Sequence, residues 1–179
     1  MIGNSEFIDT ERLYLRKFKL EDIDNMLKNW IADPVVQSAY GEPIFETKES
    51  IKSLLYKWDT QQYRWAIILK NNFENIGQIG FCKYYPEEKI AEIEYCIGQN
   101  FWGNGYIPEV ISAVIKYIFT NSNIEKIEAF HQTKNPNSGK VLQKAGMVVV
   151  SNVKRFEIQG KIPDEEICYA ITKRQYMEN

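Results

Sequence analysis

The sequence predicts an α+β fold in which a mixed, mostly antiparallel sheet is flanked by helices. Three observations lead to this prediction. First, strand-like and helix-like apolar patterns alternate along most of the chain. Second, three strand candidates follow one another with only short turns between them, which is typical of an antiparallel meander. Third, the later strands alternate with helical segments, which makes the sheet a mixed one.

The composition is that of a globular protein with one sizeable core. Of the 179 residues, 44% are hydrophobic and 26% are charged. A chain of this length buries about 70% of the surface of its unfolded state, so a second domain is not needed to form a core. Because no linker-like stretch rich in Pro, Gly or Ser interrupts the chain, we expect a single domain over residues 1–179.

Charge and hydropathy exclude several classes of partner. The net charge is −2 and Lys and Glu are interspersed, so there is no basic stripe for a nucleic acid. Residues 1–12 lack the basic start and apolar core of an export signal. The most apolar stretch, residues 106–119, contains Glu109 and Lys116 and is too short to span a membrane. We expect a cytoplasmic protein, either a monomer or a homodimer, without a nucleic-acid or membrane partner.

The three cysteines, Cys82, Cys96 and Cys168, are scattered along the chain. No pair has the spacing of metal ligands, and an odd number argues against a disulfide framework. We therefore expect reduced thiols that pack as small hydrophobic side chains, and no metal site.

The N-terminal part predicts one strand and two helices. In residues 12–18 (RLYLRKF), leucines alternate with Tyr and Arg, as in a half-buried strand. Residues 20–31 and 46–59 carry apolar side chains at helical spacing, and Thr47 is a candidate N-cap of the second helix.

A meander is predicted next, with strands over residues 63–70, 75–85 and 89–98. Asn71-Asn72 and the Pro-Glu-Glu at 86–88 provide the turns between them.

The C-terminal half predicts a helix over residues 107–119, a strand over 126–132 and a short helix over 137–146 that Gly146 ends. Residues 147–173 are expected to form two strands around a turn near Gln159-Gly160.

The join between the meander and the long helix contains Gly103 and Gly105, flanked by Trp102 and Tyr106. The N–H groups at a helix N-terminus have no intrahelical partner, and the helix dipole is positive there. A glycine turn adds uncovered amides, which together suit a phosphate or pyrophosphate. The alternative is a tight turn in which glycine only supplies positive φ angles. The spacing matches neither the dinucleotide fingerprint nor the phosphate loop. We expect Trp102 and Tyr106 to brace the turn by packing and Glu109 to favour the dipole.

Several segments, taken in order, resemble the GNAT superfamily of N-acetyltransferases, in particular the RimJ/RimL type that includes ribosomal-protein N-terminal acetyltransferases. The glycine turn and the Asn-x-x-Ser-x-x-Val-Leu-x-Lys-x-Gly segment are specific together, although neither is diagnostic alone. The resemblance covers nearly the whole chain. The segments that carry it are TERLYLRKF at 10–18, ADPVVQSAYG at 32–41, WGNGY at 102–106, NPNSGKVLQKAG at 135–146 and CYAIT at 168–172.

The resemblance implies an acetyl-coenzyme A-dependent N-acetyltransferase, with the pyrophosphate held by the backbone amides of the turn. It also implies that the strand before the turn pairs with the pantetheine arm. The family's usual Arg or Gln falls on Asn100, with Gln99 beside it, which leaves a side-chain contact in doubt but the backbone contact intact. Lys140 either reaches a phosphate or is solvated. The implied cofactor-binding residues are Tyr95, Cys96, Ile97, Phe101, Trp102, Gly103, Asn104, Gly105, Tyr106, Asn135, Ser138 and Lys140.

Transfer of an acetyl group to an amine requires a base. At pH 7, deprotonation costs about 1 kcal/mol for an α-amino group and about 4.6 kcal/mol for a lysine, so a positioned carboxylate is the usual remedy. Strand alternation places Glu92 and Glu94 on one face of their strand. Glu92 is preferred because several family members carry a base there, and Glu94 is the second candidate. The alternative for both is an exposed strand carboxylate.

For the proton donor to the leaving thiolate, Ser138 is the first candidate and Tyr169 the second, although Tyr169 equally suits a core. The resemblance gives Asn135 a contact with the cofactor or a bound water. Asn135 and Pro136 also suit the start of a helix, and the two roles are compatible. His131, the only histidine, is expected to be structural.

The acceptor is expected to be a primary amine. The resemblance implies that residues 31–45 wall the acceptor side, with Trp30, Tyr40, Phe45 and Glu94 as candidate substrate-binding residues, although the aromatics equally suit a core. Protein N-termini, polyamines, aminoglycosides and other small amines all remain open, and the lower deprotonation cost favours an α-amino group. Direct transfer is expected because no cysteine lies in a nucleophile setting. The alternatives are a non-catalytic module that binds acyl-coenzyme A or a peptide, and an unrelated nucleotide-phosphate domain.

Overall fold

The contacts of the chain divide it into two compact units in this computed structural model, which describes residues 7–151, 153–159 and 166–178. The first unit contains the chain up to Gly80 together with Tyr95–Val110, and the second contains Phe81–Glu94 and the chain from Ile111. Strands β4 (Asn75–Tyr85) and β5 (Ile90–Ile97) and helix α4 (Tyr106–Asn121) contribute to both. The single domain over residues 1–179 stays a prediction.

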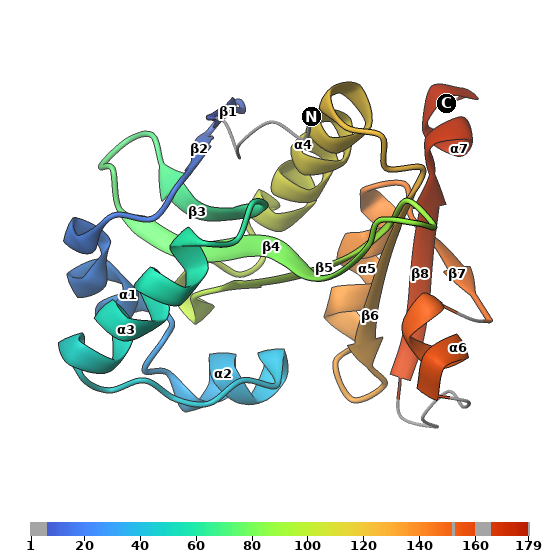
Figure 1. Ribbon diagram of the computed structural model, residues 1–179. Helices are drawn as coiled ribbons and strands as arrows, with labels where there is room; N and C mark the ends of the chain where they lie inside the picture. The colour runs from blue at the N-terminus through green and yellow to red at the C-terminus, as the bar shows by residue number, and fades with distance from the viewer. Residues whose placement is uncertain (1–6, 152, 160–165, 179) are drawn as a thin grey trace. The chain divides into compact units, whose positions relative to one another are not determined.

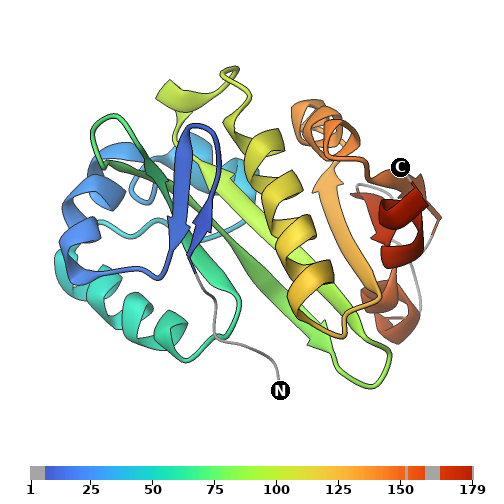
Figure 2. The same cartoon turned by 90° about the horizontal axis from the view of Figure 1, so that it is seen from above.

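The strands of the first unit lie in the order β1-β2-β3-β4-β5, with β1 (Ile8–Asp9), β2 (Leu13–Arg16) and β3 (Arg64–Leu69). Strand β2 pairs antiparallel with both β1 and β3, and β3 pairs antiparallel with β4; Figures 1 and 2 show β1 and β2 as a hairpin. In β2, Leu13 and Leu15 are fully buried while Tyr14 and Arg16 are half-exposed, which confirms the predicted half-buried strand.

Three helices accompany these strands: α1 (Ile23–Asn29), α2 (Pro34–Tyr40) and α3 (Lys48–Asp59), with a short 3-10 helix before α1. Figure 1 shows α1 and α3 side by side against the strands, and their apolar side chains form one core cluster. Thr47 accepts a hydrogen bond from the backbone N–H of Ser50 at 3.1 Å, which confirms it as the N-cap of α3.

Helix α2 was not predicted. Its start is capped by Asp33, whose Oδ1 accepts from the N–H of Val35 at 2.8 Å, and Pro34 occupies the first turn. Gly41 ends it at φ +83°. These capping residues were the signal in the sequence, because the apolar pattern of so short a helix, with Val35 exposed, is weak.

The strands of the second unit lie in the order β4-β5-β6-β8-β7, with β6 (Lys126–Gln132), β7 (Val148–Val150) and β8 (Glu166–Thr172). Strand β6 pairs parallel with β5 and antiparallel with β8, and β7 pairs antiparallel with β8. This pairing confirms the mixed, mostly antiparallel sheet. Its helices are α5 (Pro136–Lys144), α6 (Lys154–Gln159) and α7 (Lys173–Glu178).

Helices α5 and α6 cover opposite faces of β6 and β8 (Figure 1). Gly139 of α5 packs on His131 and Tyr169, whereas the guanidinium of Arg155 in α6 lies 3.7 Å above the ring of Phe130. Because neighbouring residues of a strand face opposite sides of the sheet, the two helices contact alternate residues of β6.

The prediction of two strands around Gln159-Gly160 is partly wrong. Residues 154–159 form helix α6, and Gly160 lies outside the described residues. The carboxylate of Glu128 on β6 accepts the backbone N–H of Lys154 at 2.8 Å, so a distant strand caps the start of the helix. Gly146 ends α5 at φ +87°, as predicted, while α7 was not predicted.

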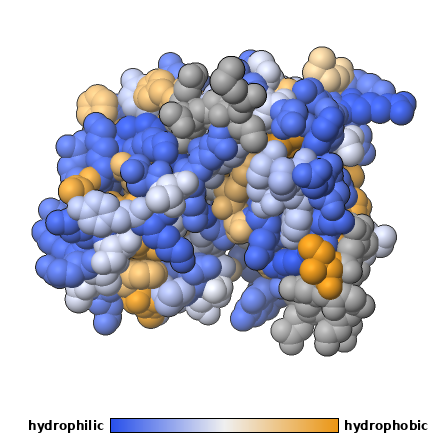
Figure 3. All heavy atoms as spheres, in the orientation of Figure 1, coloured by the Kyte–Doolittle hydropathy of each residue, from blue (hydrophilic) through white to orange (hydrophobic). Residues whose placement is uncertain are grey.

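Helix α4 confirms the helix expected at 107–119. Within the part of the chain that the structure describes, no helix is long and apolar enough to cross a bilayer. Figure 3 shows hydrophilic residues over most of the face in view, with apolar ones in scattered spots.

Candidate active site

The turn between β5 and α4 presents a run of uncovered backbone N–H groups. Gly103 and Gly105 both have φ +77°, a backbone conformation that other residues adopt only with strain. A Cβ at Gly103 would meet nothing within 4 Å, so the turn is open on this side. The N–H groups of Gly103, Asn104, Gly105 and Tyr106 donate no hydrogen bond to any described residue. They lie at the N-terminus of α4, and this arrangement fits the pyrophosphate of a coenzyme.

Two side chains hold the turn from within. The indole Nε1 of Trp102 donates to the carbonyl of Ile97 at 2.8 Å, and the Asn104 amide donates to the carbonyls of Phe101 and Trp102 at 3.1 and 3.2 Å. The side chain of Trp102 is 47% exposed. Trp102 therefore braces the turn through a hydrogen bond, not through packing as predicted.

A salt bridge from the N-terminal strands reaches the same turn. Arg12 Nη1 donates to the carbonyl of Asn104 at 2.8 Å, and Arg12 Nε and Nη2 both lie 2.8 Å from Glu109 Oε2. Thr10 and the backbone N–H of Arg12 donate to the other carboxylate oxygen of Glu109 at 2.7 and 2.9 Å. The guanidinium also lies 4.6 Å from the ring centre of Tyr106. Burial alone would raise the pKa of Glu109, but these hydrogen bonds outweigh it and hold that pKa below its usual value.

Thr10 and Arg12 were not predicted as site residues from the sequence. The only signal was their place in TERLYLRKF, one of the segments that carry the family resemblance. Glu109 was expected to act on the helix dipole alone, and its pairing with Arg12 was not foreseen.

The strand ahead of the turn contains the residues expected along the pantetheine arm. Cys96 and Ile97 are buried and Tyr95 is half-buried. The Cys96 side chain belongs to the core cluster of the first three helices. The parallel register of β5 with β6 runs from Ile90 to Glu92 only.

Glu92 lies in a buried cluster of charged groups in the second unit. The residue is 1% exposed, so it is not the exposed carboxylate of the alternative interpretation. Its Oε1 accepts from the thiol of Cys82 at 3.3 Å and lies 3.5 Å from Arg155 Nη1. Its Oε2 is buried and has no hydrogen-bond partner among the described residues. Burial raises the pKa of Glu92, and the opposing charge of Arg155 does not cancel this effect.

The neighbours of Glu92 form ion pairs of their own. Glu128, its register partner on β6, is fully buried and forms a 2.5 Å ion pair with Lys126. Arg155 also pairs with Glu166 at 2.6 Å. Glu94 is half-buried, so of the two candidate bases it is the more accessible.

The start of α5 holds the residues expected near the sulfur of the cofactor. Asn135 occupies the N-cap position and Pro136 the first turn, as predicted, but the Asn135 side chain makes no capping hydrogen bond. Asn135 and Ser138 are half-buried, and Lys140 is exposed. The Asn135 amide is thus not consumed by the helix end.

His131 and Tyr169 form the floor under α5. They are 7% and 4% exposed, and the Tyr169 hydroxyl lies 3.4 Å from His131 Nε2. A Cβ at Gly139 would lie 2.5 Å from that hydroxyl and 2.7 Å from Nε2, so only glycine lets the helix approach this closely. Burial raises the pKa of Tyr169. The core alternative stated for Tyr169, and the structural role expected for His131, agree with these positions.

The candidate acceptor residues divide into two groups. Trp30 is 1% exposed, donates to Asn75 Oδ1 at 2.7 Å and stacks on Trp58, so it is a core residue. Tyr40 and Phe45 are half-buried at the edge of that core, and the Tyr40 hydroxyl accepts from Gln78 at 2.7 Å.

Gln99 does not present its amide to the glycine turn. It donates to the carboxylate of Asp33 at 2.6 Å, and this hydrogen bond connects the 3-10 helix that contains Gln99 to the start of α2. This hydrogen bond also lowers the pKa of Asp33.

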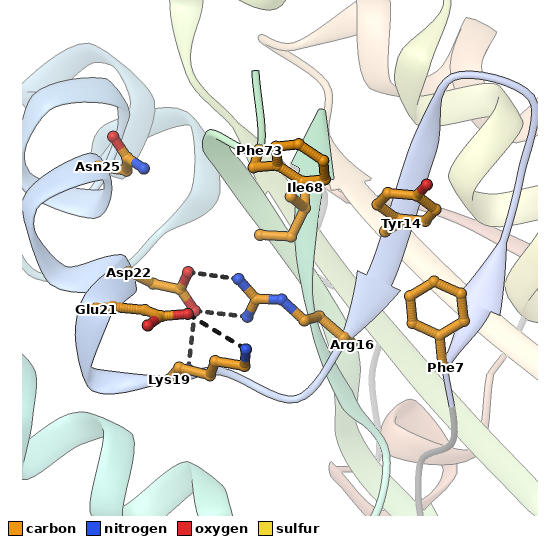
Figure 4. Close-up of a pocket in the computed structure, with 9 residues that line it drawn as sticks. All are labelled: Phe7, Tyr14, Arg16, Lys19, Glu21, Asp22, Asn25, Ile68 and Phe73. Carbon is orange, nitrogen blue, oxygen red and sulfur yellow. Dashed lines mark hydrogen bonds and ion pairs between the residues drawn. The ribbon is translucent and has the colours of Figure 1, made fainter. Parts of the chain in front are cut away.

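A surface hollow near β2 contains none of the predicted site residues (Figure 4). Arg16 and Asp22 form a two-point ion pair inside it at 2.8 Å, and the backbone N–H of Lys19 donates to the same carboxylate. Its charged groups are thus paired with one another.

Comparison with known proteins identifies the family of this chain. The sequence profile described as "Acetyltransferase (GNAT) domain" matches residues 12–148. The chain belongs to the GNAT family of acetyltransferases.

Individual relatives match most or nearly all of the chain. The N-acetyltransferase p20 of Bacillus licheniformis is 32% identical, with 96% of this chain and 98% of the relative covered. The ribosomal-protein-serine acetyltransferase of Escherichia coli is 22% identical, with 80% and 79% covered, in line with the RimJ/RimL-type resemblance. The crystal structure of a GNAT acetyltransferase from Bacillus anthracis superposes with a TM-score of 0.78 at 28% identity, covering 94% of this chain and 99% of that one.

A GNAT acetyltransferase uses acetyl-coenzyme A as co-substrate. Among the described residues, no group of three or more His, Cys, Asp or Glu side chains could hold a metal ion.

The thiols of this GNAT chain should be unreactive in the folded state. Burial and the nearby charge of Glu166 raise the pKa of Cys168 to about 11, and burial also raises the pKa of Cys82. We expect alkylation of Cys168 at pH 8 to be about 100-fold slower than in urea-denatured protein. Peptide mapping by mass spectrometry checks this. Rapid labelling would contradict the raised pKa of Cys168, whereas an acetyl group found on Cys82 or Cys168 after incubation with acetyl-coenzyme A would contradict direct transfer.

Proposed function

We propose that this acetyltransferase transfers the acetyl group of acetyl-coenzyme A directly to a primary amine, without a covalent acetyl-enzyme. The observation that carries the proposal is the set of unbonded N–H groups at Gly103, Asn104, Gly105 and Tyr106, ahead of α4. Backbone amides in this geometry bind the pyrophosphate, and the backbone of Tyr95–Ile97 pairs with the pantetheine arm. When bound, the coenzyme supplies an activated acyl group as a thioester.

Glu92 is the base in this proposal. Its Oε2 is a buried carboxylate oxygen without a hydrogen bond from any described residue, and it accepts the proton of the attacking amine directly or through one water. Because the pKa of Glu92 is raised, it lies closer to the pKa of an amine, which favours proton transfer from the amine to the carboxylate. Glu94 remains the second candidate because it is the more exposed of the two.

Residues at the start of α5 protonate the leaving thiolate and contact the coenzyme. The Ser138 hydroxyl donates a proton to the leaving sulfur as the carbon–sulfur bond breaks and the carbon–nitrogen bond forms, and it recovers a proton from the solvent. Asn135 binds the coenzyme or a water through its side-chain amide, which makes no capping hydrogen bond to the helix. Lys140 is exposed, which supports a solvated role over a phosphate contact.

The acceptor that we propose is an α-amino group, as at a protein N-terminus. An α-amino group costs about 1 kcal/mol to deprotonate at neutral pH, against about 4.6 kcal/mol for a lysine. The relative named ribosomal-protein-serine acetyltransferase also favours a protein acceptor. Tyr40, Phe45 and Glu94 are the acceptor-lining candidates, since Trp30 belongs to the core.

Thiol release from acetyl-coenzyme A tests this function. The enzyme is incubated with labelled acetyl-coenzyme A and an amine panel of N-terminal peptides, amino acids, polyamines and aminoglycosides. We expect thiol release to depend on the amine and to be largest with peptides. Coenzyme binding without release for any amine would instead support the non-catalytic module, and competition by ATP but not by coenzyme A would support a nucleotide domain.

A further inference from the structure

The two polar groups of the peptide between Asn104 and Gly105 differ in their hydrogen bonding. Its carbonyl oxygen, on Asn104, accepts a hydrogen bond from Arg12 Nη1 at 2.8 Å. In a planar trans peptide the C=O and N–H bonds point in opposite directions. Arg12 therefore turns the N–H of Gly105 away from itself, and that N–H is one of the unbonded groups of the turn.

The preceding part of the turn follows the same rule. The carbonyl of Trp102 accepts from the Asn104 side chain, so the N–H of Gly103, in the same peptide group, points the other way. Both glycines have φ +77°, which lets alternate peptide groups direct their carbonyls inward and their N–H groups outward.

Arg12 is itself held in place and paired. Its Nε and Nη2 grip Glu109, and Glu109 is held at its other oxygen by Thr10 and the Arg12 backbone. Without Arg12, a carboxylate in the first turn of α4 would oppose an anion at the helix N-terminus. With Arg12 the pair is neutral.

We infer that Arg12 is a positioning residue for the coenzyme: it orients the Gly105 amide toward the pyrophosphate and neutralises Glu109. This inference rests on the proposed function. It assigns to Arg12 an effect on the nucleotide end of the coenzyme and none on the reacting thioester.

Two ligand pairs separate these effects: coenzyme A against pantetheine in calorimetric binding, and acetyl-coenzyme A against acetyl-pantetheine in turnover. The shorter ligands lack the pyrophosphate. For Arg12→Ala we expect the Kd of coenzyme A and the KM of acetyl-coenzyme A to rise about 10- to 100-fold. Pantetheine binding and kcat should change less than about threefold. Arg12→Lys should fall between, because an ammonium cannot hold the carbonyl and the carboxylate in one planar fork.

Arg16→Ala is the matched control. Arg16 lies on β2, the strand that directly follows Arg12, and its guanidinium also binds a carboxylate through two hydrogen bonds, here the carboxylate of Asp22. This variant should leave the preference for coenzyme A over pantetheine unchanged. If Arg12→Ala lowers the melting temperature strongly, Arg12→Lys carries the test.

Equal losses for both ligands, or an unchanged preference in Arg12→Ala, would overturn the inference. Failure of the proposed function looks different: the wild-type protein itself would then bind coenzyme A no more tightly than pantetheine.

Discussion

Replacing Glu92 by glutamine is expected to lower kcat by about 10²- to 10⁴-fold, the usual contribution of a general base. Glutamine keeps the size of the side chain but cannot accept a proton from the amine. The binding of coenzyme A should remain within a few-fold of wild type, since the amides of the glycine turn are untouched. Single-turnover kinetics with a peptide acceptor measure the change.

Two variants serve as matched controls for Glu92→Gln. Glu94→Gln tests the second candidate on the same strand, and Glu128→Gln removes the buried register partner, which caps α6 through Lys154. We expect Glu128→Gln to affect mainly stability. A larger loss of kcat in Glu94→Gln than in Glu92→Gln would transfer the role of base to Glu94.

The pH dependence gives a second readout on Glu92. Because burial raises its pKa, the acid limb of kcat/KM should lie above the ordinary glutamate range. The folded protein holds this proton more tightly than the unfolded chain, so stability from this group is present at low pH and is lost as pH rises through the folded pKa. Glu92→Gln should therefore be at least as stable as wild type at pH 8. A marked drop in melting temperature there would indicate a structural carboxylate.

Gly77→Ala is expected to reduce the free energy of unfolding by about 2–4 kcal/mol. A Cβ at Gly77 would lie 2.2 Å from the carbonyl oxygen of Cys96 and 2.9 Å from the Cα of Ile97. Both are backbone atoms of β5, so relief requires the strands to move apart. The displaced segment is the one proposed to pair with pantetheine, and the affinity for pantetheine should fall with stability.

Gly103→Ala separates this clash from backbone strain. At Gly103 the added Cβ meets no atom within 4 Å, and the cost comes from φ +77° alone. We expect about 1–2 kcal/mol there. Urea denaturation of both variants measures the difference, and a smaller loss for Gly77→Ala than for Gly103→Ala would contradict the close approach of the two strands.

The elements that the sequence predicted correctly share one property: their pattern is local. Leu13 and Leu15 alternate with polar residues in β2, and Thr47 caps α3. The segment that forms helix α6 was predicted as a strand. The first N–H of this helix donates to Glu128, which belongs to a strand well before it in the chain, so the helix start has no local signal. No window of sequence around residue 154 contains that information.

The candidate site follows the same division. The two glycines by themselves predicted an exposed turn ahead of a helix. The direction of the turn's amides depends on Arg12, which reaches them from the other end of the first unit's sequence. Likewise, Glu92 and Glu94 are both acidic residues of one strand, and only the structure shows that Glu92 is buried whereas Glu94 is half-buried.

By itself the sequence determined the fold class, most of the strands and helices, and the glycine turn, because apolar periodicity and glycine conformation act over a few neighbouring residues. Only the tertiary structure decided that Arg12 and Glu109 form a neutral pair at the turn, that Trp30 belongs to the core and that Glu92 is buried. Those properties depend on contacts between segments that are far apart in the chain, which the order of residues does not specify locally.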